Sequence, residues 1–292
     1  ASRDAALLIA WEPYNWDDSS LDQTALRPAN IAAGNYDTYI TDWLKSAQGY
    51  AKDDTIMVRF APEMNDAVRP WSIGVNGGNT PQDYINIWRH VYDIKKTVAP
   101  DVVMVWNPLV AGSDLAGNPV TLSSVYPGSA YVDVLALDGF NWADTQNPGT
   151  CGWQSYDDVF KNPIAEIKTL ANGKPWGIAE VASASKPDSH FQSGGPCYGA
   201  WGSWVYAWPE KAPYYSTTSD WITQAGWMKT MMQQAHRDGA LFVNMFNTQK
   251  ETDWRLNSTP EGDDVLTMVK SDTAFKAGGE NSGGYIKAAL KG

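Results

Sequence analysis

Six short runs of apolar and β-branched residues, separated by segments with helical periodicity, constrain the fold of this chain more than any other feature. Strands that alternate with helices at this interval predict βα units and a mostly parallel sheet. The run Thr55–Phe60 begins with four residues typical of a strand buried on both faces. The predicted strands are Leu7–Trp11, Thr55–Phe60, Val102–Trp106, Val132–Leu137, Trp176–Ala179 and Ala240–Phe246.

Helix signals lie between these runs. Apolar residues recur at helical spacing over Gly34–Ala51. The segment Pro81–Val98 has Thr80 as its expected N-cap, proline at its first position and Asp83 at its third. Further helices are expected after Ser155, Ser219 and Glu261.

The length of the chain fits one (β/α)8 TIM barrel, which needs about 250 residues. The chain has 292 residues, 43% of them hydrophobic, so we predict one barrel domain over residues 1–276 and a flexible Gly-rich tail over 277–292. Residues 184–219 are rich in Gly, Pro, Trp and Tyr and follow a predicted strand, so we expect them to line a cleft.

Charge and hydropathy restrict the classes of partner. The formal net charge of -11 and the pI near 4.7 oppose binding to nucleic acid or to an anionic membrane. No run of about 20 apolar residues is present, so no membrane span is expected. The 15 tryptophans and 14 tyrosines suit stacking against sugar rings, although we expect most of them in the core.

The two cysteines, Cys151 and Cys197, have no spacing that indicates a zinc site. A disulfide between them would join the loop after Trp142 to the loop after Glu180. It would place the protein in an oxidising, extracellular setting, and the alternative is two free thiols in a cytoplasmic protein. We expect a secreted protein, which also fits a chain that starts without Met.

Two glutamates stand where predicted strands end. Glu63 follows Thr55–Phe60, and Glu180 follows Trp176–Ala179. Side chains at the carboxyl ends of barrel strands perform the chemistry in enzymes of this fold. A retaining glycosidase needs one protonated and one ionised carboxyl group about 5 Å apart, which two strands facing each other across a barrel can provide. Either glutamate could instead be a salt-bridge or capping residue.

Further motifs accompany these glutamates in order along the chain. They are Arg59-Phe60-Ala61-Pro62-Glu63-Met64-Asn65, Arg69-Pro70-Trp71, Trp106-Asn107-Pro108, Asp138-Gly139-Phe140-Asn141-Trp142, Ile178-Ala179-Glu180 and Asp253-Trp254-Arg255. Over residues 7–260 this series resembles glycoside hydrolase family 26. That family comprises retaining (β/α)8 enzymes without metal or cofactor. Most are endo-β-1,4-mannanases, and smaller groups act on mixed-linkage β-glucan or β-1,3-xylan.

The resemblance implies a role for each site residue. Glu63 is expected to be the acid/base and Glu180 the nucleophile, while Trp254 and Arg255 are expected to hold a sugar on the non-reducing side of the cleaved bond. Arg59 and Asn65 are expected to support Glu63 by hydrogen bonds. The other candidates for substrate contacts are Trp11, Trp71, Trp106, Asn107, Asp138, Phe140, Asn141 and Trp142.

Three positions depart from the family pattern. Pro62 stands where a histidine usually precedes the acid/base, and the segment 66–68 lacks the usual aromatic residue. These two departures leave the preference for mannan open. Phe140 replaces a tyrosine whose hydroxyl would hydrogen-bond the nucleophile, so we expect slow turnover or a substitute such as Asn141.

The leading hypothesis is a secreted endo-acting hydrolase of β-1,4-mannan. The alternatives are action on mixed-linkage β-glucan or β-1,3-xylan, and a catalytically weak barrel that binds carbohydrate or serves in an assembly. The family's first two strands are expected to precede Ala1. An open barrel would expose two unpaired edges, so we expect another segment or a second chain to complete it.

Overall fold

The computed structural model describes residues 6–143, 152, 154–184, 224–256, 286, 289 and 290. The chain forms two compact units. The first comprises Ala1–Asp138, Pro163–Ala179 and Gly278–Gly292, and the second comprises Gly139–Asn162 and Glu180–Ala277. The predicted disulfide, the helix expected after Glu261, the insert 184–219 apart from its first residue, and most of the tail lie outside the described residues.

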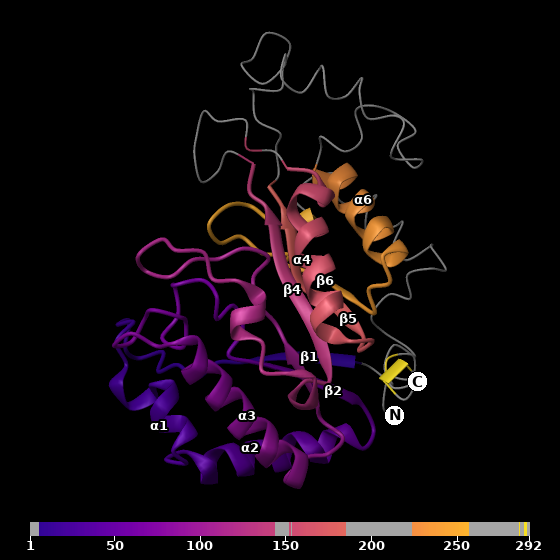
Figure 1. Ribbon diagram of the computed structural model, residues 1–292. Helices are drawn as coiled ribbons and strands as arrows, with labels where there is room; N and C mark the ends of the chain where they lie inside the picture. The colour runs from indigo at the N-terminus through magenta and orange to yellow at the C-terminus, as the bar shows by residue number, and fades with distance from the viewer. Residues whose placement is uncertain are drawn as a thin grey trace. The chain divides into compact units, whose positions relative to one another are not determined.

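The strands follow one another in the sheet in the order in which they occur in the chain. The pairings of β1 with β2, β2 with β3 and β3 with β4 are parallel (Figure 1). This is the strand order of a (β/α)8 barrel with six of its strands among the described residues, so the predicted fold class is confirmed. The strands are β1 (Ala6–Trp11), β2 (Thr55–Phe60), β3 (Val103–Trp106), β4 (Val134–Asn141), β5 (Trp176–Ser183) and β6 (Val243–Met245).

The first unit contains α1 (Pro28–Ala32), α2 (Asp37–Ala51) and α3 (Pro81–Val98). Both α1 and α2 pack on α3, and α2 also contacts β2 (Figure 1). The start of α3 follows its predicted capping. Thr80 Oγ1 accepts from Asp83 N, and the Asp83 carboxylate accepts from Thr80 N at 2.8 Å. This reciprocal capping satisfies two donors at the helix start, so the sequence alone located that end.

The helices after the predicted turns are also present. α4 (Tyr156–Ala171) begins in the second unit, which also contains α6 (Gln224–Arg237) and β6. The methionines of α6 are buried in the core, and Trp227 Nε1 donates to the Gln154 carbonyl at 2.7 Å. None of the described helices is long and apolar enough to cross a membrane.

Two strands extend further than their sequence pattern predicts. β4 starts at Val134, two residues later than expected, directly after Asp133, whose side chain accepts from the Met104 N–H at 2.8 Å. It then continues through Asp138–Asn141, and β5 continues through Glu180 to Ser183. Polar and glycine residues at these ends resemble a loop in the sequence, whereas hydrogen bonding to neighbouring strands keeps them extended.

Candidate active site

Glu63 lies in an unusual backbone conformation directly after β2. Its φ is 55° and that of Ala61 is 45°, both in the left-handed region. Residues other than glycine rarely adopt this region, and such strain persists only where the surroundings enforce it. Conformations of this kind gather at active sites, so the backbone marks Glu63 as a candidate independently of its side chain.

Several hydrogen bonds hold the loop that carries Glu63. Its backbone N–H donates to the Asn107 carbonyl at 2.8 Å, and Ala61 N donates to the Trp11 carbonyl at 2.9 Å. Trp71 Nε1 donates to the Pro62 carbonyl at 2.7 Å. The loop is therefore fixed to the ends of both β1 and β3, and the Glu63 side chain is presented from a rigid base.

Asn65 supports this loop through the backbone of the next one. Its Nδ2 donates to the Leu109 carbonyl at 2.8 Å, and its Oδ1 accepts from Leu109 N at 2.9 Å. The expected hydrogen bond from Asn65 to the Glu63 carboxylate is therefore wrong. Because Asn65 is 0% exposed, its amide positions the loop instead of binding substrate.

Arg59 connects the ends of three strands. Its Nη1 donates to Asn107 Oδ1 and to Asp138 Oδ2, each at 3.1 Å. The Arg59 side chain is 13% exposed, and that of Asp138 is 0% exposed. A charge-assisted network this far from water fixes the carboxyl ends of β2, β3 and β4 relative to one another, which is the preorganisation that a site on these ends needs.

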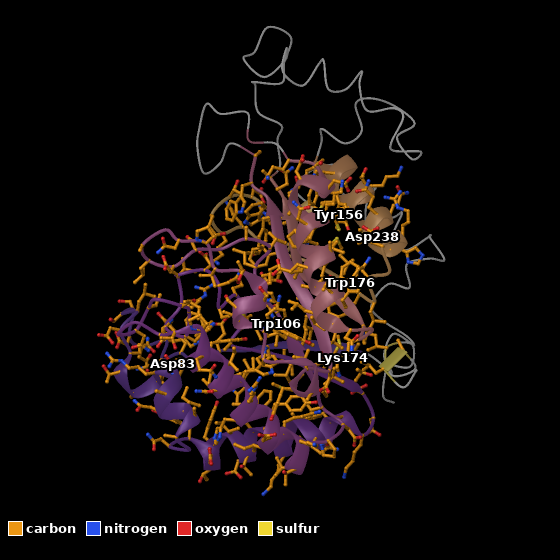
Figure 2. The ribbon with its side chains drawn as sticks, in the orientation of Figure 1. Asp83, Trp106, Tyr156, Lys174, Trp176 and Asp238 are labelled. Carbon is orange, nitrogen blue, oxygen red and sulfur yellow. The ribbon has the colours of Figure 1, made fainter. Side chains whose placement is uncertain are left out.

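Three of the predicted substrate contacts are core residues. Trp71 and Trp106 are both 0% exposed, and Trp106, labelled in Figure 2, lies edge-on to Tyr126 with ring centroids 5.0 Å apart. Trp11 is 8% exposed and stacks on Trp43 at 4.1 Å. Rings buried in this way have no open face for a sugar, so in this conformation they brace the strand ends.

Burial changes the pKa of two groups near this loop. Burial raises the pKa of the Asp66 carboxyl, while the N–H of Ala67 and the charge of Arg69 oppose the rise. Burial also raises the pKa of the Tyr84 phenol well above its usual value, opposed by the neighbouring Trp106 indole. The raised pKa keeps the Tyr84 phenol neutral at neutral pH.

The second unit holds Glu180 and an aromatic cluster that we define as Phe140, Trp142, Phe246 and Trp254. Glu180 is the only partly exposed residue of β5, and every other residue of this strand is buried. Phe140 lies 5.7 Å from Trp142, 5.7 Å from Phe246 and 5.5 Å from Trp254 between ring centroids. The aromatic cluster therefore lines the end of β4 in this unit.

Within the aromatic cluster, exposure separates two roles. Trp254 is 1% exposed and meets Trp142 edge-on at 4.8 Å, whereas Trp142 is partly exposed. Arg255 binds Asp253 through two parallel hydrogen bonds of 2.8 and 3.0 Å, which raise the pKa of its guanidinium. Phe140, Trp142 and Phe246 are therefore the partly exposed rings of this cluster, and the buried Trp254 supports them.

Asn141 does not replace the missing tyrosine hydroxyl. Its Nδ2 donates to Ser183 Oγ at 3.0 Å, and its Oδ1 accepts from the N–H groups of Ala143 and Gln154. These bonds engage both ends of the amide in holding the loop after β4. The expectation that Asn141 takes over the role of a tyrosine at position 140 is therefore not met.

Gly112 and Phe246 were not recognised from the sequence. Gly112 allows its loop to pass close to Asn65. Phe246, which follows β6, contributes to the aromatic cluster by packing against Phe140. Neither lies in a motif, and only the approach of distant segments gives them a role. Within the described residues, no group of three or more His, Cys, Asp or Glu side chains is placed to hold a metal ion.

Replacement of Gly112 by alanine is expected to impair the Glu63 loop. A Cβ at this position would lie 2.1 Å from the Asn65 carbonyl oxygen and 2.6 Å from its carbon. Backbone atoms cannot yield without moving the loop, so we expect a loss of about 1–3 kcal/mol in the free energy of unfolding, together with lower activity. Gly49→Ala in α2 is the control, because nothing lies within 4 Å of its added Cβ. Equal urea midpoints for the two variants would contradict this role.

Comparison with known proteins gives one curated relative and several structural matches. No family model matches the chain. The chain is 32% identical over 258 residues to a protein named Endoglucanase H from Acetivibrio thermocellus. This match covers 87% of the chain but only 23% of the relative, so the chain spans less than a quarter of that protein.

Solved structures of glycoside hydrolases overlap with parts of the chain. A family 26 enzyme from a Muricauda species is 21% identical with a TM-score of 0.44, covering 63% of this chain and 60% of its own. A family 26 β-mannanase from Bacteroides ovatus is 16% identical with a TM-score of 0.43, covering 67% and 57%. The family 53 catalytic domain from Ignisphaera aggregans is 18% identical with a TM-score of 0.45, covering 82% and 61%. Two of these three are named as family 26 enzymes.

Proposed function

We propose that this protein is an endo-acting glycoside hydrolase that cleaves a β-linked polysaccharide with retention of configuration. The observation that carries the proposal is the exposure along the strands. Arg59 in β2, Phe140 in β4 and Glu180 in β5 are each the only partly exposed residue of an otherwise buried strand. Side chains at the carboxyl ends of barrel strands carry the chemistry in enzymes of this fold, and Glu63 follows β2.

Glu63 and Glu180 perform the two steps of a double displacement in this proposal. The protonated Glu63 carboxyl donates its proton to the leaving oxygen while the Glu180 carboxylate attacks the anomeric carbon. Glu63 then takes a proton from the water that hydrolyses the glycosyl ester. The mechanism requires a separation of about 5 Å between the two carboxyl groups and needs neither metal nor cofactor. Product analysis by NMR tests it, since an inverted first-formed anomer would exclude it.

Three substrates are candidates: β-1,4-mannan, mixed-linkage β-glucan and β-1,3-xylan. The sequence motifs favour β-1,4-mannan, the main substrate of the family that they resemble. The relative named as an endoglucanase favours a β-glucan, and Pro62 at the position of the usual histidine leaves the preference for mannan open. Release of reducing ends from β-1,4-mannan, mixed-linkage β-glucan and β-1,3-xylan distinguishes these candidates. Failure to cleave any of the three would leave only a carbohydrate-binding or assembly role.

Replacement of Phe140 by tyrosine tests whether turnover is slow because the proposed nucleophile lacks a hydrogen bond from a tyrosine hydroxyl. The aromatic cluster leaves Phe140 partly exposed on the strand next to β5, so a hydroxyl at this ring can be accommodated without being buried in the core. A hydrogen bond to a charged group contributes about 1.5 kcal/mol, so we expect kcat to rise about tenfold. An unchanged kcat, with thermal stability equal to that of wild type, would show that no such bond forms.

We also propose that the protein is secreted and contains a Cys151–Cys197 disulfide. The support is the cysteine pair itself, in a chain whose sequence contains no other cysteine. Titration of free thiols in the unfolded, unreduced protein tests the pairing. Two reactive thiols per chain would contradict it.

A further inference from the structure

The loop after β1 displays an aromatic pair at the protein surface. Trp16 is 74% exposed, more than any other large hydrophobic residue in the described part of the chain. Tyr14 lies against it, with ring centroids 4.6 Å apart and planes at 64°. Single exposed apolar residues are ordinary, so the meaning of this pair depends on how its backbone is held.

A buried glutamine fixes the loop on both sides of Trp16. The Gln23 side chain accepts from Asn15 N at 2.9 Å and donates to the carbonyls of Asn15 and Asp18 at 3.1 and 2.8 Å. Gln23 is only 5% exposed, and Asn76 Nδ2 donates to its carbonyl. Three hydrogen bonds from one amide thus hold residues 15 and 18 in place, and the indole between them projects into water from a rigid tip.

The same loop starts beside the loop that carries Glu63. The last residue of β1, Trp11, is paired with Phe60, and its carbonyl accepts from Ala61 N. Trp16 is five positions after Trp11, so their Cα atoms lie at most about 18 Å apart. Trp16 is therefore within the span of a few sugar units from the loop of the proposed acid/base.

The charges around the aromatic pair indicate the kind of ligand. Residues 12–22 contain Glu12, Asp17, Asp18 and Asp22 and no lysine or arginine. Asp22 pairs with Arg27 at 2.9 Å, and Asp17 and Asp18 are exposed. A negative rim repels polyanions such as uronic-acid polymers, whereas it leaves the apolar face of a neutral sugar free to stack on the indole.

We propose that Tyr14 and Trp16 form a stacking platform for an outer sugar of a neutral polysaccharide, remote from the cleaved bond. This inference rests on the proposed glycosidase function. Flat rings with little rotamer freedom bind at low entropic cost, and the Gln23 amide has already ordered the loop that carries them. The platform adds contacts that a long chain can reach and a short oligosaccharide cannot.

The test compares Trp16→Ala with Tyr50→Ala. Tyr50 is 70% exposed but lies near the end of α2, which leads to the amino end of β2. Initial rates on mixed-linkage β-glucan, on β-1,4-mannan and on short oligosaccharides of the same linkages give KM and kcat. We expect Trp16→Ala to raise KM for the cleaved polymer about threefold to tenfold while kcat and the oligosaccharide constants stay unchanged. Tyr50→Ala is expected to match wild type.

Electrophoresis in native gels containing each polymer, or polygalacturonate as the anionic control, measures binding separately. If a neutral polymer retards the wild-type protein but not Trp16→Ala, the platform is supported. This holds even if no polymer is hydrolysed, and in that case only the proposed glycosidase function fails. Equal retardation and equal KM for the two proteins would overturn the platform. Retardation by polygalacturonate, or a Trp16→Ala effect confined to self-association in sedimentation experiments, would overturn it as well.

Discussion

Replacement of Glu63 by glutamine is expected to lower kcat on the polysaccharide at least a hundredfold without loss of folding. Glutamine has nearly the same shape but cannot donate a proton to the leaving oxygen, and general acid catalysis contributes about 10²–10⁴ in rate. Folding is preserved because backbone groups hold the loop. The Glu63 N–H donates a hydrogen bond to the Asn107 carbonyl, and the Pro62 carbonyl accepts one from the Trp71 indole. Glu180→Gln is expected to abolish turnover, since it removes the nucleophile.

The two glutamates can be assigned by chemical rescue. With an activated aryl glycoside, azide should restore activity to Glu63→Ala and give the β-glycosyl azide, because the glycosyl ester on Glu180 still forms. In Glu180→Ala azide should attack directly and give the α-glycosyl azide. Asp42→Asn, an exposed carboxylate in α2, is the control for loss of charge. Wild-type activity in either glutamine variant would exclude the double displacement.

Replacement of Asp133 by alanine is expected to destabilise the protein by about 3–5 kcal/mol, the cost of removing one partner from a buried ion pair. The carboxylate accepts from Lys95 Nζ at 3.0 Å, from Met104 N at 2.8 Å and from the Tyr92 hydroxyl at 2.8 Å. The Lys95 side chain is 7% exposed, so its charge would be left in the core. Burial and the charge of Asp133 raise the pKa of the Tyr92 phenol, which keeps this donor protonated.

Two further variants separate lost charge compensation from lost packing. In Asp133→Asn one acceptor remains, so we expect an intermediate loss of stability. Adding Lys95→Met to Asp133→Ala removes the uncompensated ammonium and should recover part of the loss. Urea unfolding of the three variants measures these differences. A loss below about 1 kcal/mol in Asp133→Ala would show that the pair contributes no more than a surface ion pair.

Local patterns were enough to predict the fold. The apolar runs gave six strands, and the strands follow one another in the sheet in chain order. Consecutive elements usually lie next to each other in space, and helices connect β1 to β2, β2 to β3 and β4 to β5. The limits of α3 were predicted to the residue because Thr80, Pro81 and Asp83 satisfy its first turn locally. The ends of β4 and β5 were missed, because residues such as Asp138 and Glu180 are held extended by hydrogen bonds to neighbouring strands and not by their own propensities.

The sequence by itself determined which residues belong to the candidate site, because glutamates at strand ends and the motifs around them are properties of neighbouring residues. Only the tertiary structure decided what each one does. It buried Trp71, Trp106 and Asn65 as supports, left Arg59, Phe140 and Glu180 partly exposed, and bonded Gln23 to the backbone on both sides of Trp16. Exposure and hydrogen-bond partners depend on segments far apart in the chain, and the spacing of residues along one segment does not contain that information.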